Sequence, residues 1–340
     1  FQNIGYYYFN QDLIELNADT TLGSNRLDLN VRPISELPEV VLSKYRIGQI
    51  EVHLSKSSDS VTSAPATVRY KDLLIHSQGD YLKSAVIHDA LYFSPGDLYS
   101  QDAHQKSMVR LNNLGVFSYV RINYLPSARD SLAKELDVRI DLILADQINF
   151  HLETDLVMKS TGFLGPGVTV GTTNSNAFGG AEKFQVDLKG GFEWQWAASE
   201  EAQLGTFSYE FGINSSLTFP KLLVPWKHSG YKDLLSKETT VNLNFDILNR
   251  VEYYSMFSAL TSLKYSWGKT QAIRHSYTPV YLNSVSLLET TPAFDSIVED
   301  NIYIQKSFEE QFIFGMRYEF KYDNTNRRKP QNTYFSMGAS

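Results

Sequence analysis

Long segments of alternating apolar and polar residues dominate the chain between residues 145 and 340. In residues 184–196 one side of the pattern carries Phe, Val, Leu, Gly and Trp, and the other carries Gln, Asp, Lys, Gly and Glu. Alternation with a period of two predicts β-strands with one apolar face. About nine strands are expected, at residues 148–156, 165–173, 184–196, 207–219, 241–247, 254–267, 277–288, 312–322 and 333–339.

The length of these strands constrains their surroundings. Several reach 11–13 residues, whereas strands of soluble domains average about 5–6 residues and a tilted transmembrane strand needs about 9–11. Trp194, Trp196, Phe219 and Trp267 lie near strand ends, where membrane-spanning strands place aromatic residues. The pattern therefore favours a transmembrane β-barrel over a large soluble β-sandwich or lipocalin-like barrel. Residues 295–308 are expected to form a short amphipathic helix in a loop.

Hydropathy and charge argue against other classes of protein. The mean hydropathy is −0.28, and no apolar run approaches the roughly 18 residues of a membrane-spanning helix. This argues against a helical membrane protein. The net charge of −7 argues against a nucleic-acid partner. Cysteine is absent, which removes thiol catalysis, disulfides and thiolate metal sites.

Motifs that carry chemistry are missing from the sequence. The seven histidines are scattered and none falls in a metal-ligand spacing. The glycines at 165, 167 and 171 lack the Lys-Ser/Thr that completes a phosphate-binding loop, so they are expected to bend or twist a strand. Glu153 and Asp155 share a strand face without a partner acid, base or metal. We predict no enzyme, no catalytic or metal-binding residue and no cofactor.

The aromatic content changes near residue 145, which marks a boundary. Residues 145–340 hold all four tryptophans and about twice the aromatic density of residues 34–144. The earlier segment is predicted to be an α+β module in the order strand, helix, helix, strand, strand. The predicted elements are strand 45–54, a loop at 55–67, helix 82–91, a helix capped by Ser100 and ended by Gly115, and strands 116–124 and 136–144.

The first 33 residues are too few to fold alone. Residues 4–9 and 26–31 are predicted to be strands, and two strands bury too little apolar surface to form a stable domain. The tail of a preceding module is the favoured interpretation. The alternative is a hairpin that packs on the following module.

Two groups of motifs resemble one family. Residues 90–120 resemble a POTRA domain, because a turn containing Gly96 precedes a helix that ends in Leu-x-x-Leu-Gly-x-Phe, with Gly115 and Phe117 in the last positions. Residues 176–182, a turn with Phe178, Gly179 and Gly180, resemble the opening of the barrel in the BamA/TamA superfamily of outer-membrane assembly factors. Within this superfamily, the sequence most resembles the TamA-like proteins of Bacteroidetes.

The resemblance implies a domain organisation and a location. Residues 1–33 would end a preceding POTRA domain, 34–144 would be the last POTRA domain, and 145–340 would be the N-terminal part of a transmembrane β-barrel. The family places its POTRA domains in the periplasm and its barrel, of sixteen strands, in the bacterial outer membrane. About nine strands are expected here, so the sequence is expected to be a fragment.

The resemblance also implies a function that needs no cofactor. Such proteins guide client outer-membrane barrels or exported surface proteins through the POTRA domains to a lateral gate in the barrel, beside the lipid bilayer and sometimes with periplasmic or inner-membrane accessory proteins. The edge of the first barrel strand can template a client strand. The candidate gate residues are Ile148, Asn149, Phe150, His151, Leu152, Glu153 and Thr154.

Other functions stay open at this point. A two-partner-secretion transporter would share the POTRA domains and barrel but export one dedicated client. A passive porin-like channel would fit a charged barrel interior but not the POTRA-like module. A soluble β-rich binding protein is a more distant alternative.

Overall fold

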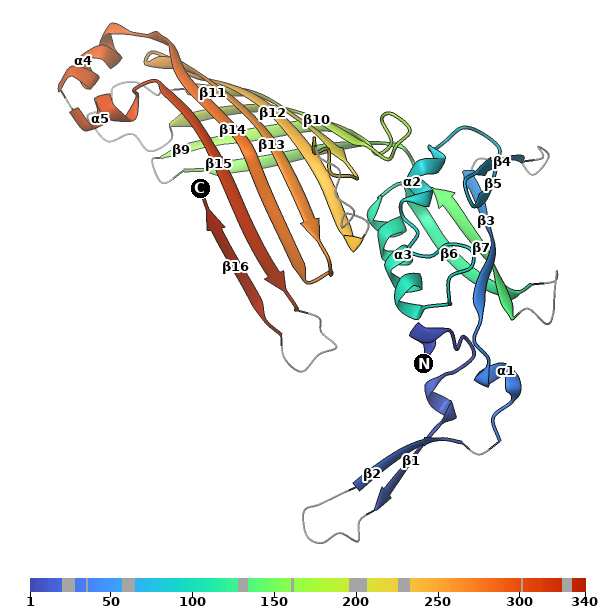
Figure 1. Ribbon diagram of the computed structural model, residues 1–340. Coiled ribbons are helices and arrows are strands. Elements are labelled where there is room, and N and C mark those ends of the chain that lie inside the picture. The colour runs from blue at the N-terminus through green and yellow to red at the C-terminus, as the bar shows by residue number, and fades with distance from the viewer. Residues whose placement is uncertain are drawn as a thin grey trace. The chain divides into compact units, whose positions relative to one another are not determined.

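The computed structural model describes residues 1–19, 28–34, 36–56, 65–127, 134–159, 162–195, 207–225, 233–300, 302–325 and 332–340. The chain divides into two compact units, Phe1–Ala145 and Asp146–Ser340. The first runs from blue to green in Figure 1 and the second from green to red. Each unit contains one larger β-sheet.

The second unit is a nine-stranded antiparallel sheet in which every strand pairs with its neighbours in sequence (Figure 1). The strands are β8 (Ile148–Met158), β9 (Phe163–Asn174), β10 (Lys183–Gln195), β11 (Phe207–Phe219), β12 (Ser236–Arg250), β13 (Tyr254–Gly268), β14 (Ile273–Thr290), β15 (Gln311–Asp323) and β16 (Tyr334–Ala339). The nine predicted strands are confirmed. The sheet is open over the described residues, with β8 at one edge and β16 at the other.

The pairing register explains why alternation in sequence produces two chemically distinct faces. Residues that pair across strands point to the same side of a sheet. One row across five strands is apolar and consists of Leu152, Val170, Leu188, Ile213 and Phe245. These five side chains are all at least 43% exposed, so a large apolar face of the sheet is uncovered.

The predicted aromatic residues lie near both ends of the strands. Trp194 is the penultimate residue of β10, whereas Phe219 ends β11 and Trp267 nearly ends β13. Because β10 runs antiparallel to β11 and β13, Trp194 lies at the opposite rim from the other two. Trp196 lies outside the described residues.

The connection from β14 to β15 folds into two short helices, α4 (Pro292–Asp300) and α5 (Ile302–Ser307). Phe294 is buried and its ring lies 5.0 Å from the rings of both Tyr254 and Phe308. The single helix expected over 295–308 is therefore a pair, held by this aromatic cluster to the start of β13.

The first unit contains a five-stranded sheet in the order β4-β5-β3-β7-β6. Its elements are α1 (Glu39–Leu42), β3 (Arg46–Lys56), β4 (Ala66–Tyr70), β5 (Leu73–Ser77), α2 (Ser84–His88), α3 (Gln101–Asn113), β6 (Phe117–Pro126) and β7 (Glu135–Leu144). Strand β3 is parallel to β5 and β7, and the two outer pairs are antiparallel.

Every second residue of β3 and β7 is buried, which places the core on one face of this sheet. Ile50, Val52, Ile140 and Leu142 are fully buried there, and so is Leu111 of α3. The opposite face carries the half-buried polar side chains of the same strands.

The hairpin β4–β5 was not expected. The predicted order of strand, helix, helix, strand, strand is present, but this hairpin is inserted after its first strand. The turn at Lys71 and Asp72 lacks the glycine or asparagine that such turns favour, and Lys71 adopts φ 52° itself. The loop predicted at 55–67 is shorter at both ends, because β3 runs to Lys56 and β4 begins at Ala66. Residues 57–64 lie outside the described residues.

The strand predicted at residues 4–9 is wrong. The segment forms the 3₁₀ turn η1 (Gln2–Ile4) and then bends at Gly5, whose φ is 105°. Its tyrosines pack instead of pairing, since the Tyr7 ring lies 4.8 Å from that of Tyr99. After a second 3₁₀ turn, η2 (Gln11–Leu13), the hairpin of this region consists of β1 (Ile14–Asp19) and β2 (Asp28–Pro33).

The ends predicted for helix α3 are confirmed. The Ser100 side chain accepts a hydrogen bond from the Ala103 amide, and Gly115 follows the helix with φ 69°. Phe117 then begins β6. Within the described residues, no helix is long and apolar enough to cross a membrane.

We expect Ser100→Ala to destabilise the first unit by about 1 kcal/mol, because the Ala103 amide loses its acceptor. Amide hydrogen exchange in the first turn of α3 would detect the loss. Ser100→Asp restores an acceptor and should stay close to the parent protein. Equal protection in all three would contradict the capping role.

Candidate functional site

Strand β8 is the candidate site because it is an edge strand with an uncovered surface. All eleven of its residues are exposed, and Phe150 and Leu152 are 80% and 69% exposed. Among the described strands it pairs with β9 alone. Every second residue of an edge strand turns its N–H and C=O away from the sheet, so β8 offers a row of unpaired backbone groups.

A contact on the polar face connects β8 to β10 across the strand between them. His151 Nε2 lies 3.2 Å from Asp187 Oδ1, a distance that forms an ion pair when the imidazole is protonated. Gly171 of β9 pairs with both residues and lies between them. A Cβ atom at Gly171 would collide with both side chains, so only glycine leaves room for this contact.

The same arrangement recurs at two other glycines of the polar face. A Cβ at Gly167 would lie 2.6 Å from Asp155 Oδ1, and a Cβ at Gly212 would collide with Asp246. Each glycine thus faces a carboxylate on the neighbouring strand. The expectation that Gly167 and Gly171 only bend or twist a strand is incomplete, because they also make space for charged side chains.

The two ends of β8 are also held by side chains. At one end Lys159 Nζ lies 2.7 Å from Glu193 Oε2 of β10. At the other, the Gln147 side chain donates a hydrogen bond to the Asn176 carbonyl, and the Gln147 backbone carbonyl accepts one from the Ser175 amide. Strand β8 is therefore anchored on its paired side along its length.

The turn that Gln147 contacts is the one containing Phe178, Gly179 and Gly180. Gly179 adopts φ 77°, and the Gly180 amide donates to Glu182 Oε2 at 2.8 Å. Glu182 is 7% exposed, so the turn is closed by a buried carboxylate. Phe178 itself is exposed at the turn's surface.

The remaining predicted site residues lie in the first unit, in two separate turns. Gly96 adopts φ 90° in the turn at residues 94–97, where its amide donates to the Ile47 carbonyl. Gly115 lies between α3 and β6, and Phe117 is the first residue of β6. These residues shape the first unit, whereas β8 belongs to the second.

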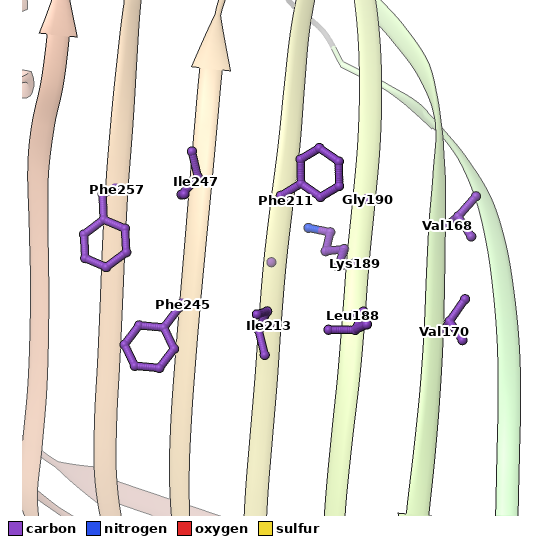
Figure 2. Close-up of a pocket in the computed structure, with 11 residues that line it drawn as sticks. Val168, Val170, Leu188, Lys189, Gly190, Phe211, Ile213, Phe245, Ile247 and Phe257 are labelled. Carbon is purple, nitrogen blue, oxygen red and sulfur yellow. The ribbon is translucent and has the colours of Figure 1, made fainter.

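The apolar face of the second unit contains a shallow hollow of about 430 Å³. Figure 2 shows Leu188, Phe211, Ile213 and Phe245 around it, from β10, β11 and β12. Gly190 leaves the gap, since the nearest atom to a Cβ there would be a ring carbon of Phe211 at 4.0 Å. The lining is apolar, which suits hydrocarbon chains.

The first unit has its own pocket, of about 890 Å³, beside the edge strand β6. Tyr99 and Tyr124 line it with their rings 5.1 Å apart. Burial raises the pKa of Tyr99 to about 12 and also raises the pKa of Tyr124. Both phenols therefore stay neutral, and Tyr124 contacts His104 Nδ1 at 3.2 Å.

The described geometry defines a class: an open antiparallel sheet with an exposed apolar face, preceded by a small α+β module. No protein-family model and no curated protein matches the chain.

Its neighbours among solved structures include one BamA and two CdiB structures. BamA from Haemophilus ducreyi lacking POTRA domains 1–3 shares 10% identity with a TM-score of 0.36, over 96% of this chain and 59% of that one. CdiB from Escherichia coli shares 10% identity with a TM-score of 0.38, over 96% of this chain and 57% of that one. CdiB from Acinetobacter baumannii shares 9% identity with a TM-score of 0.31, over 94% of this chain and 54% of that one. The chain thus spans less than two thirds of each structure.

Proposed function

We propose that this chain belongs to an outer-membrane assembly or translocation factor that passes client β-strands along its own exposed strand edges. The observation that carries the proposal is β8, an eleven-residue edge strand that is anchored on one side and has no partner on the other among the described strands. An unpaired edge of this length is a template for an incoming strand.

The exposed apolar face supports a membrane location. Phe150, Phe211, Phe312 and Phe314 are each at least 63% exposed on the second unit. A soluble protein that exposed such a surface over many strands would aggregate, whereas lipid solvates it. The polar face, with pairs such as Lys189–Glu210 at 2.6 Å, would then line the interior of a barrel.

A membrane location requires more strands than the nine. The unpaired edges of β8 and β16 would each expose backbone polar groups to hydrocarbon. Further strands, from the same chain or another, would complete the barrel. A weak seam beside β8 would allow a client strand to pair there and leave into the bilayer.

The first unit would receive clients before they reach the nine-stranded sheet of the second unit. Its outer strands β4 and β6 have free edges within the described residues, and β6 borders the pocket that contains Tyr99 and Tyr124. These features suit capture of an extended chain by strand addition. We propose that this unit is a periplasmic POTRA-type domain and that residues 1–33 continue from a preceding one.

Site-specific cross-linking tests the proposal. The absence of cysteine allows a benzophenone probe to be attached at one introduced cysteine. We expect Leu152→Cys on β8 to capture client chains during their assembly in cells, because it lies on the free edge strand. Leu243→Cys is the matched control, an exposed leucine on β12 with a partner strand on each side.

The identity of the captured chains separates the candidate functions. Several different outer-membrane proteins at position 152 would support an assembly factor, whereas one dedicated client would favour a two-partner-secretion transporter. Equal capture at both positions, or none at either, would contradict strand addition at β8 and favour a passive channel.

A further inference from the structure

The open face of the first unit's sheet brings together three metal-ligating side chains. Glu51 and His53 are two residues apart on β3, so both point to the face opposite the core. His76 of β5 pairs directly with His53 in the parallel register. Sequence spacing concealed the group, because the two histidines lie 23 positions apart in the sequence and only the parallel pairing of β3 and β5 brings them together.

The three side chains are close enough to share one ion. One ligand atom from each lies within 4.8 Å of the others. The two imidazole rings are stacked, with centroids 4.8 Å apart and planes inclined by 24°. All three residues are half-buried, so the group is shielded by neighbours but open to solvent on one side.

Neighbouring polar groups already orient two of the ligands. Thr67 Oγ1 lies 2.9 Å from His76 Nδ1, which leaves Nε2 of that ring to bind an ion. Gln49 Nε2 donates to Glu51 Oε1 at 2.8 Å, which leaves the second carboxylate oxygen. Metal-binding histidines and carboxylates typically carry such supporting hydrogen bonds.

Burial favours a neutral ring at His53. It is the main cause of the lowered pKa of His53; Arg139 and His76 lower it further, and Asp141 and Glu51 oppose them. A neutral imidazole is the form that binds a metal ion. The positive charge of Arg139 would oppose a cation, but Arg139 is itself paired with Asp141 at 2.9 Å.

We propose that Glu51, His53 and His76 form a binding site for a divalent transition-metal ion of the zinc type. Two imidazoles and one carboxylate are a typical donor set for Zn²⁺ in which further coordination positions stay open to water or a ligand. The site is independent of β8, because all three residues lie in the other unit.

Titration of the full chain with Zn²⁺, in competition with a chromophoric chelator, tests the site. We expect one Zn²⁺ to bind and Co²⁺ to give the visible absorption of a low-coordinate site. Glu51→Gln and His76→Gln should each weaken Zn²⁺ binding at least about tenfold, since even the loss of a supporting hydrogen bond costs that much. His275→Gln, which removes a histidine of the other unit, is the control.

Glu51→Gln is the more decisive variant, because it removes the charge of a half-buried side chain without changing its shape. The variant should therefore fold like the parent chain. Zn²⁺ should also raise the unfolding temperature of the parent chain but not of this variant. Binding that is unchanged in both variants, or weaker than about 1 mM in the parent chain, would overturn the proposal.

Discussion

Gly171→Val should weaken the pairing of the candidate gate strand β8 with β9. A Cβ at this position collides with His151 and Asp187, so the valine must push both side chains away and break their contact. Forcing a side chain into a packed site costs about 1–3 kcal/mol, and the β8–β9 pairing carries that strain. We expect a matching fall in the free energy of unfolding, measured with denaturant in detergent micelles.

Gly190→Val is the matched control for this substitution. Gly190 lies on the adjacent strand β10, but a Cβ there has no neighbour nearer than 4.0 Å. The same change should therefore leave stability unchanged or raise it slightly by filling the hollow shown in Figure 2. Equal losses at both glycines would show that the His151–Asp187 contact does not decide the outcome.

A proline on the free edge of β8 should abolish client delivery while the sheet stays folded. Leu152 and Glu153 are successive residues, so one of their amides points toward β9 and the other points away. Proline lacks the N–H, and at the outward position it removes a donor offered to a client without breaking a bond to β9. Client assembly in cells should fall at least about tenfold.

The two adjacent variants, Leu152→Pro and Glu153→Pro, control for each other. The inward proline removes a β8–β9 hydrogen bond and should lower stability, whereas the outward one should not. Denaturant unfolding therefore shows which of the two variants carries the inward proline and which the outward one. Full client assembly with the outward proline would refute strand addition at β8, whatever the inward variant does.

Alternation along the chain was sufficient to predict the nine strands of the second unit. Strand β11 was placed at its observed bounds, and β10 within one residue at each end. The two ends of helix α3 could also be predicted from the sequence, because Ser100 and Gly115 act on residues a few positions away. The strand expected at residues 4–9 failed because packing of Tyr7 against Tyr99 overrides local preference.

The sequence by itself determined where the strands of the second unit run and which of their residues share a face, since a period of two is a property of each strand alone. Only the tertiary structure decided which strands meet and in what register. The His151–Asp187 contact needs three strands aligned at Gly171, and the group of Glu51, His53 and His76 needs β3 beside β5. Register is set by pairing between distant segments, so these sites came into being only when the sheets formed.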